Sequence, residues 1–134
     1  MPLEVLKTIP ILRIFSVEKA REFYVGFLGF GVDWEHRFDE HAPVYMRVSR
    51  AGCVPRLTEH HGDCCPGSTV FLRVKGLDEF HREIRAKGYT FMRPGVEPTP
   101  WGSKGMEVTD PFGNRIRFDE SNTPAANTAL HPTE

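Results

Sequence analysis

One stretch of the sequence decides how the chain folds, and it reads Pro100-Trp-Gly-Ser-Lys-Gly-Met-Glu-Val-Thr-Asp-Pro-Phe-Gly-Asn-Arg-Ile-Arg-Phe118. Apolar side chains alternate with polar ones at 106–108 and again at 116–118, which is typical of two half-buried β-strands. Between them, residues 110–114 place proline where a turn needs a fixed φ and glycine where it needs a positive one. The stretch therefore predicts a β-hairpin that joins antiparallel neighbours.

A large aromatic side chain stands at the mouth of this hairpin. Trp101 precedes Gly102, so its ring is carried on a flexible backbone just before the first strand. Two interpretations fit the sequence equally well: either the ring is presented to a ligand, or it plugs the edge of the sheet.

The hairpin is part of a repeat with an offset of about sixty residues. Four pairs of segments correspond at this offset: Ile11-Leu-Arg-Ile14 with Phe71-Leu-Arg-Val74, the helix end Gly29-Phe30 with Gly88-Tyr89, Met46-Arg-Val48 with Met106-Glu-Val108, and Arg56-Leu57 with Arg117-Phe118. Each copy reads strand, helix, strand, strand, strand, so we expect an α+β fold made of two βαβββ units. Each unit exposes an apolar sheet face that it cannot bury alone, so two units should pair, within the chain or across a dimer.

These patterns also set the expected boundaries. Residues 1–60 form the first βαβββ unit, 61–67 a linker, 68–120 the second βαβββ unit, and 121–134 a mobile C-terminal tail with little to bury. In the first unit we expect strands at 8–15, 30–35, 44–49 and 55–59, and a helix that Ser16 caps and Gly29 ends. In the second unit the helix spans 77–87.

Composition narrows the class of protein. The 134 residues suffice for a core without disulfides, and 17 Lys and Arg against 18 Asp and Glu argue against nucleic acid or an anionic membrane as partner. No apolar run is long enough to span a bilayer and the first residues lack the pattern of a signal peptide, so we expect a cytoplasmic protein. Cys53, Cys64 and Cys65 have no CxxC spacing, so free thiols are expected.

One cluster has the composition of a metal site. His60-His61 is followed by Asp63 and the Cys64-Cys65 pair, but adjacent side chains on an extended chain point to opposite sides and no second pair follows at a zinc-site spacing. A solvated loop is therefore the favoured interpretation. No Gly-rich phosphate loop and no Gly-x-Ser-x-Gly motif occurs in the sequence.

Four motifs of the chain occur together: Ile9-Pro-Ile-Leu12, Phe23-Tyr-x3-Leu-Gly-Phe30, Val74-Lys-Gly-Leu-Asp-Glu79, and Trp101-Gly-x3-Met-x-Val-x-Asp-Pro-x-Gly-Asn114. With the paired βαβββ units, they resemble the glyoxalase and bleomycin-resistance superfamily, and within it the bleomycin-resistance proteins. The resemblance covers residues 8 to about 120. It implies a cupped, incomplete barrel and a homodimer with two ligand grooves.

In the metalloenzyme branches of that superfamily, four side chains that face the cup hold a divalent metal. The corresponding positions here are Ile9, Arg56, Thr69 and Arg117, which offer no competent set of ligands. The resemblance therefore implies no bound metal, no cofactor and no catalytic residue. A one-residue shift would bring in Thr58 or Glu59, at the cost of turning that strand inside out.

In the drug-binding branch, aromatic rings sandwich the planar part of the drug while carboxylates face its cationic tail. The matching candidates for ligand binding here are Asp33, Trp34, Phe38, Phe71, Trp101 and Gly102. We therefore expect a protein that sequesters a planar, partly cationic antibiotic of the bleomycin type and confers antibiotic resistance. For Trp34 the competing interpretation is a ring packed on the helix.

Several arginines favour a second hypothesis. If they point into the cup, an anionic ligand suits them better than a cationic one: Arg13, Arg47, Arg56, Arg73 and Arg117. The alternative is therefore a small-molecule enzyme of the same superfamily, a lyase, isomerase or dioxygenase. Such an enzyme would use either a metal at other positions or Arg56 and Arg117 as an anion clamp.

Overall fold

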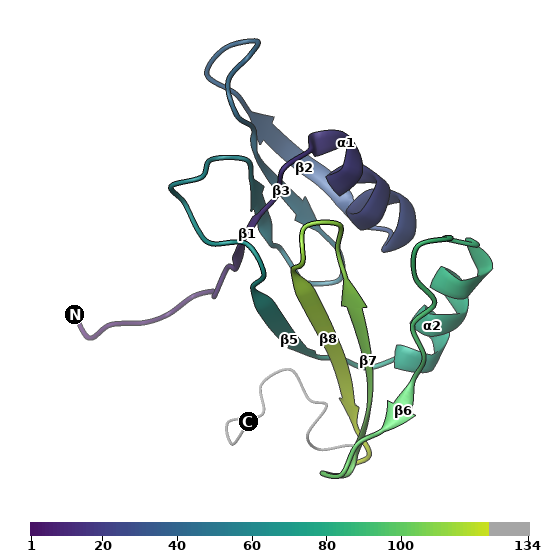
Figure 1. The fold of residues 1–134 in the computed structure, drawn as a ribbon. Coiled ribbons are helices and arrows are strands. Elements are labelled where there is room, and N and C mark those ends of the chain that lie inside the picture. Colours follow the sequence, from purple (N-terminus) through teal and green to yellow (C-terminus); the bar gives the residue numbers. More distant parts are fainter. Residues whose placement is uncertain (124–134) are drawn as a thin grey trace. The chain divides into compact units, whose positions relative to one another are not determined.

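The structure of the chain is a computed structural model that describes residues 1–123 (Figure 1). The described residues form two compact units: unit 1 comprises residues 1–68 and 111–113, and unit 2 comprises residues 69–110 and 114–123. The expected C-terminal tail lies, from residue 124 on, outside the described residues. In the described part, no helix is long and apolar enough to cross a membrane.

Unit 1 is a four-stranded mixed sheet with one helical segment (Figure 1). Its elements are β1 (Ile11–Arg13), α1 (Val17–Ala20), η1 (Arg21–Phe27), β2 (Gly31–His36), β3 (Tyr45–Ser49) and β4 (Arg56–Thr58). The strand order is β1-β4-β3-β2, with β1 parallel to β4 and the other neighbours antiparallel.

Strand β1 is shorter than the expected 8–15. Pro10 has no N–H to donate, and its carbonyl instead accepts a hydrogen bond from the Arg56 amide at 2.9 Å, so regular pairing begins at Ile11. At the other end the chain leaves the sheet to reach Ser16, whose side chain accepts from the Lys19 amide at 3.1 Å and caps the helix as expected.

The helix of unit 1 changes type along its length. After the four residues of α1, the seven residues of η1 form a π-helix, and the Leu28 amide bonds the Phe23 carbonyl at 2.9 Å. The sequence predicted one continuous amphipathic helix, and its periodicity contains no signal for this wider turn. The buried face is as expected and holds Phe23, Tyr24 and Phe27, and the chain turns at Gly29 with a φ of 77°.

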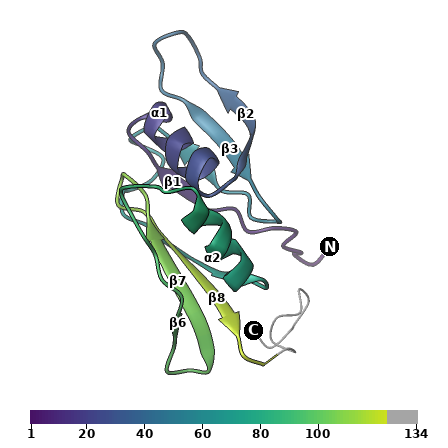
Figure 2. The same cartoon turned by 90° about the vertical axis from the view of Figure 1, so that its right-hand side faces the viewer.

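Unit 2 repeats the plan with β5 (Thr69–Arg73), α2 (Leu77–Ala86), β6 (Glu97–Pro98), β7 (Ser103–Thr109) and β8 (Arg115–Ser121), as Figure 2 shows from the side. Its sheet has the order β5-β8-β7-β6, with β5 parallel to β8. Gly76 precedes α2 and offers no side-chain cap. The Glu120 carboxylate caps the helix instead, accepting hydrogen bonds from the backbone amides of Gly76 and Leu77 at 3.2 and 3.1 Å.

The two units correspond in register as well as in order, which confirms the repeat and the α+β fold class. In unit 1 the residues paired across the parallel strands β1 and β4 are Ile11 with Arg56, Leu12 with Leu57, and Arg13 with Thr58. The equivalent pairs across β5 and β8 of unit 2 are Phe71 with Arg117, Leu72 with Phe118, and Arg73 with Asp119. Neither sheet closes on itself within residues 1–123, because each ends in two different edge strands.

The predicted hairpin is also confirmed. Met106 lies opposite Phe118 and Val108 opposite Ile116, and all four side chains are buried. The turn is held by Asp110, whose carboxylate accepts from the backbone amide and the side-chain amide of Asn114 at 2.8 and 2.9 Å. One face of each strand is therefore used by the core, and the opposite face is left for other contacts.

Candidate ligand-binding site

In unit 1 the sheet carries two stacked aromatic rings on the face opposite the core. Trp34 on β2 and Tyr45 on β3 stack with centroids 5.8 Å apart and planes inclined by 17°. The Arg56 guanidinium from β4 lies 5.5 Å from the Trp34 centroid and 6.0 Å from that of Tyr45. We call Trp34, Tyr45 and Arg56 the Trp34 face. Trp34 is 36% exposed, so its ring is not packed into the core beneath the helix.

Asp33 lies at an irregularity of β2, where the pairing with β3 shifts register between Val32 and Trp34. Its carboxylate accepts from the Ser49 hydroxyl at 3.0 Å and pairs with the Arg47 Nε at 2.9 Å. The hydrogen bond from Ser49, together with that from Arg47 and its charge, lowers the pKa of Asp33. The negative charge that we expected to face a cationic ligand thus already has an arginine partner.

Phe38 lies in the connection between β2 and β3 and is 78% exposed. Its ring stands edge-on to the imidazoles of His36, at 4.9 Å, and His60, at 6.5 Å. His60 therefore belongs to an aromatic group, a role that its sequence context did not suggest. Residues 61–63 form a turn, as expected of a loop, and Asp63 accepts from the Thr58 hydroxyl at 2.7 Å.

In unit 2 the indole of Trp101 is held at one edge and otherwise open. Its Nε1–H donates to Asp119 at 3.3 Å, while the residue remains 67% exposed, which is inconsistent with a ring that plugs the sheet. Gly102 has a φ of 80°, a conformation that glycine adopts without strain. Asp119 is only 2% exposed and also accepts from the Ser103 hydroxyl at 2.7 Å.

The same carboxylate connects Trp101 with the neighbouring strand β5. Arg73 Nε lies 3.3 Å from the second oxygen of Asp119, and the Arg73 guanidinium lies 5.8 Å from the ring of Phe71, which is 51% exposed. We call Phe71, Arg73, Trp101 and Asp119 the Trp101 face. It combines two exposed rings with a charge pair that is balanced within the unit.

The six predicted site residues thus fall into two sets. Unit 1 holds Asp33, Trp34 and Phe38, and unit 2 holds Phe71, Trp101 and Gly102. Sequence reasoning missed Tyr45 and Asp119. Both could have been found from strand register, because Tyr45 lies opposite His36 on β2 and Asp119 lies opposite Arg73 on β5.

The four positions that correspond to the metal ligands of the metalloenzyme branches carry side chains with other surroundings here. Ile9 precedes β1, and Thr69 is exposed on β5. Arg56 lies against the rings of the Trp34 face, and Arg117 pairs with Glu107 at 2.7 Å. Among residues 1–123 no three His, Cys, Asp or Glu side chains are grouped so that they could hold a metal ion.

Comparison with known proteins identifies the family of the chain. A sequence model described as glyoxalase superfamily protein matches residues 3–124, so the chain belongs to the glyoxalase superfamily. The search among curated proteins gave no match.

Three solved structures illustrate the likeness, and at their level of identity they show the fold alone. A bleomycin resistance determinant encoded on the transposon Tn5 is 20% identical over 89% of this chain and 100% of its own, with a TM-score of 0.67. The bleomycin-binding protein of Streptomyces verticillus, complexed with copper(II)-bleomycin, is 23% identical over 91% of this chain and 100% of its own, with a TM-score of 0.66. A glyoxalase-related enzyme from Clostridium phytofermentans is 18% identical over 89% and 97%, with a TM-score of 0.67.

Proposed function

We propose that this protein is a non-catalytic, cytoplasmic binding protein that sequesters a planar, partly cationic antibiotic of the bleomycin type. The observation that carries the proposal is the Trp101 indole, fixed through its N–H to a buried carboxylate while most of its ring is exposed. A ring held in this way presents a flat surface at little cost in conformational entropy, and such a surface suits a conjugated planar group.

The arrangement of charge weakens the case for an anionic ligand. Three of the five arginines that favoured an anion are paired with carboxylates of their own unit: Arg47 with Asp33, Arg73 with Asp119, and Arg117 with Glu107. Their positive charge is therefore largely offset before any ligand arrives. Arg56 lies against Trp34 and Tyr45, where it contributes to a flat stacked surface.

The similar structures support the same proposal by analogy of fold. Two of them are described as a bleomycin resistance determinant and as a bleomycin-binding protein complexed with copper(II)-bleomycin. A third is described as a glyoxalase-related enzyme, so an enzyme acting on a small molecule is the alternative.

We also propose that the protein acts as a homodimer with the ligand groove at its interface. Leu3, Val5 and Leu6, which precede the edge strand β1, are 92%, 70% and 87% exposed. Exposed apolar side chains beside an edge strand are typical of a surface that a second chain covers. A particle of one chain at micromolar concentration, measured by light scattering, would contradict the dimer.

The test is a calorimetric titration of wild type and Trp101→Ala with metal-free and copper(II)-bleomycin. Loss of one stacking face should weaken binding by roughly 5- to 150-fold, which corresponds to about 1–3 kcal/mol. Phe91→Ala is the matched control, because Phe91 is an aromatic residue of unit 2 that is 73% exposed but lies outside the strands. This control should bind like wild type.

Two outcomes would overturn the proposal. Wild type that shows no saturable binding of either form would favour the enzyme alternative. Equal losses in Trp101→Ala and Phe91→Ala would show that Trp101 has no special part in binding.

A further inference from the structure

Arg56, the charged member of the Trp34 face, has no anionic partner within residues 1–123. Its half-buried guanidinium lies against the rings of Trp34 and Tyr45, and its buried Nε has no hydrogen-bond partner in the described chain. A ring face offers a cation only a partial negative charge, and a buried donor that stays unpaired is costly. The charge of Arg56 is therefore left to be balanced from outside unit 1.

The internal repeat shows that this arrangement is particular to unit 1. Arg117 has the equivalent position in unit 2, where it lies directly opposite Glu107 on β7 and pairs with it at 2.7 Å. Arg56 instead lies directly opposite Arg47 on β3. Opposite charges at such positions stabilise a sheet, whereas like charges destabilise it. Where unit 2 has a neutral pair, unit 1 thus has two cations, of which Asp33 offsets only Arg47.

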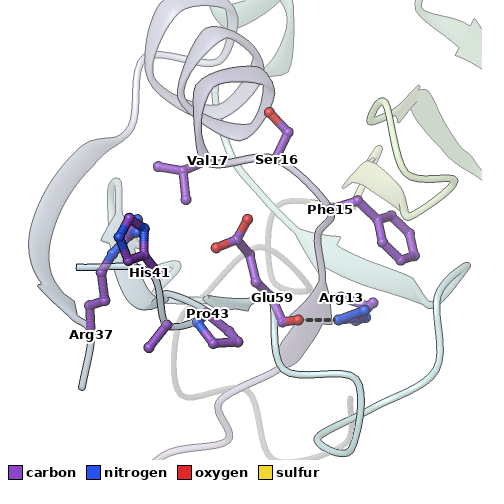
Figure 3. Close-up of a pocket in the computed structure, with 9 residues that line it drawn as sticks. Arg13, Phe15, Ser16, Val17, Arg37, His41, Pro43 and Glu59 are labelled. Atoms are coloured by element: carbon purple, nitrogen blue, oxygen red, sulfur yellow. Dashed lines mark hydrogen bonds between the residues drawn. The ribbon is translucent and has the colours of Figure 1, made fainter. Parts of the chain in front are cut away.

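The arginine of the neighbouring edge strand has a different setting. Arg13 on β1 donates through Nη1 to the Glu59 carbonyl at 2.6 Å. Figure 3 shows this bond at the side of a pocket that Trp34, Tyr45 and Arg56 do not line. Arg56 differs from Arg13 in having rings as neighbours and no acceptor for its buried Nε in the described part of the chain.

The two rings beside Arg56 restrict the shape of a ligand that could balance its charge. Because Trp34 and Tyr45 stack with planes inclined by only 17°, and Trp34 is 36% exposed, they offer a flat surface on which a planar aromatic group can stack. A carboxylate attached to such a group lies close to the plane of its rings. Its two oxygens also match the forked donors of a guanidinium. One flat, anionic molecule can therefore contact the rings and the charge together.

We propose that the Trp34 face binds an aromatic carboxylate, which stacks on Trp34 and Tyr45 while its carboxylate pairs with Arg56. Arg56 is then the residue that selects an anion. The site lies within unit 1 and does not rest on the proposed binding of bleomycin, which is argued from Trp101 in unit 2.

Three naphthalene derivatives separate the contribution of the rings from that of the charge. 2-Naphthoate is planar and anionic, 2-naphthamide has nearly the same shape without the charge, and 2-naphthylmethylamine is a cation at neutral pH. Titration followed by amide chemical shifts should show saturable binding of 2-naphthoate, with shifts gathered at residues 31–36, 45–49 and 56–58. 2-Naphthamide should bind about tenfold more weakly, because hydrogen bonds between two charged groups are the stronger ones, and 2-naphthylmethylamine should not bind.

The repeat supplies a matched control for Arg56. Arg56→Gln should bind 2-naphthoate about tenfold more weakly and no better than 2-naphthamide, whose own affinity should not change because the rings remain. Arg117→Gln, at the equivalent position of unit 2, should bind all three probes like wild type. Trp34→Ala should weaken both 2-naphthoate and 2-naphthamide by at least about fivefold, whereas Trp101→Ala should weaken neither.

The proposal is overturned if 2-naphthoate gives no saturable shifts at these residues, if 2-naphthamide or 2-naphthylmethylamine binds as tightly, or if Arg56→Gln and Arg117→Gln bind 2-naphthoate alike. The comparison of the three probes on wild type decides the matter even where a variant fails to fold. Bleomycin binding and its dependence on Trp101 test the other proposal, so the two succeed or fail independently.

Discussion

Replacing Asp119 should separate the anchoring of Trp101 from the folding of unit 2. The carboxylate is 2% exposed and receives hydrogen bonds from Ser103 and Trp101, and it pairs with Arg73. In Asp119→Leu, which is similar in size, all three contacts are lost. Removing one member of a buried charge pair costs about 3–5 kcal/mol of unfolding free energy.

The lower end of that range applies here, for two reasons. The Arg73 side chain keeps 24% exposure, so water partly solvates its charge. Its Nε and the facing oxygen of Asp119 are 3.3 Å apart but are not aligned as a hydrogen bond. We therefore expect a loss of about 3 kcal/mol in Asp119→Leu. Asp119→Asn retains an acceptor and should lose only about 1–2 kcal/mol, because a neutral acceptor is roughly half as strong.

Urea unfolding measures the stability, and the fluorescence anisotropy of Trp101 in a Trp34→Phe background measures the anchoring. Anisotropy should fall in Asp119→Leu and be kept in Asp119→Asn. Glu107→Gln is the control, since Glu107 is an exposed carboxylate of the same sheet and should change stability by no more than about 1 kcal/mol. If Asp119→Leu is as stable as wild type and holds Trp101 as rigidly, the anchoring argument is wrong.

Three further predictions concern unit 1. Ser16→Ala removes the cap of the first helix and should cost about 1 kcal/mol in thermal or urea unfolding; an unchanged midpoint would contradict the capping role. Because the pKa of Asp33 is lowered in the folded protein, its stabilising effect is complete above the ordinary value of 3.8 and is lost as the pH falls below it. Asp33→Asn should therefore be less stable than wild type at pH 7 and equal to it well below pH 3.8, and a gap that persists in acid would refute this assignment. Burial raises the pKa of the Cys53 thiol to about 11, so a disulfide reagent at pH 8 should modify the exposed Cys65 first and Cys53 only slowly, with the order read by mass spectrometry; equal rates would count against the burial of Cys53.

Much of the fold could be predicted because its signals are local or periodic. The alternation at 106–108 and 116–118, the turn between them and the offset of about sixty residues led to the observed hairpin and to units that match in register. The π-helix of 21–27 could not be predicted, since the same apolar spacing fits an α-helix.

The candidate site was harder to predict, because its contacts depend on the register between paired strands, which no single segment of the sequence shows. Trp101 was a candidate because it is a large ring beside a glycine, and in the structure it is 67% exposed, while its part in ligand binding stays a prediction. Its anchor Asp119 lies eighteen residues away and becomes visible only once β8 is paired. In the same way, the charge of Asp33 looked available in the sequence, whereas in the structure it is paired with Arg47 across two strands.

The two helix caps differ in when they can form during synthesis of the chain. The Ser16 side chain accepts a hydrogen bond from the Lys19 amide, three residues ahead, so the first helix has its cap as soon as its own first turn has left the ribosome. The second helix depends on Glu120, which lies 43 residues beyond Leu77. A nascent chain that ends before β8 therefore carries that helix uncapped and β5 without its parallel neighbour. The sheet and the helix cap of unit 2 can form only after β8 has been synthesised, whereas the first helix can form early.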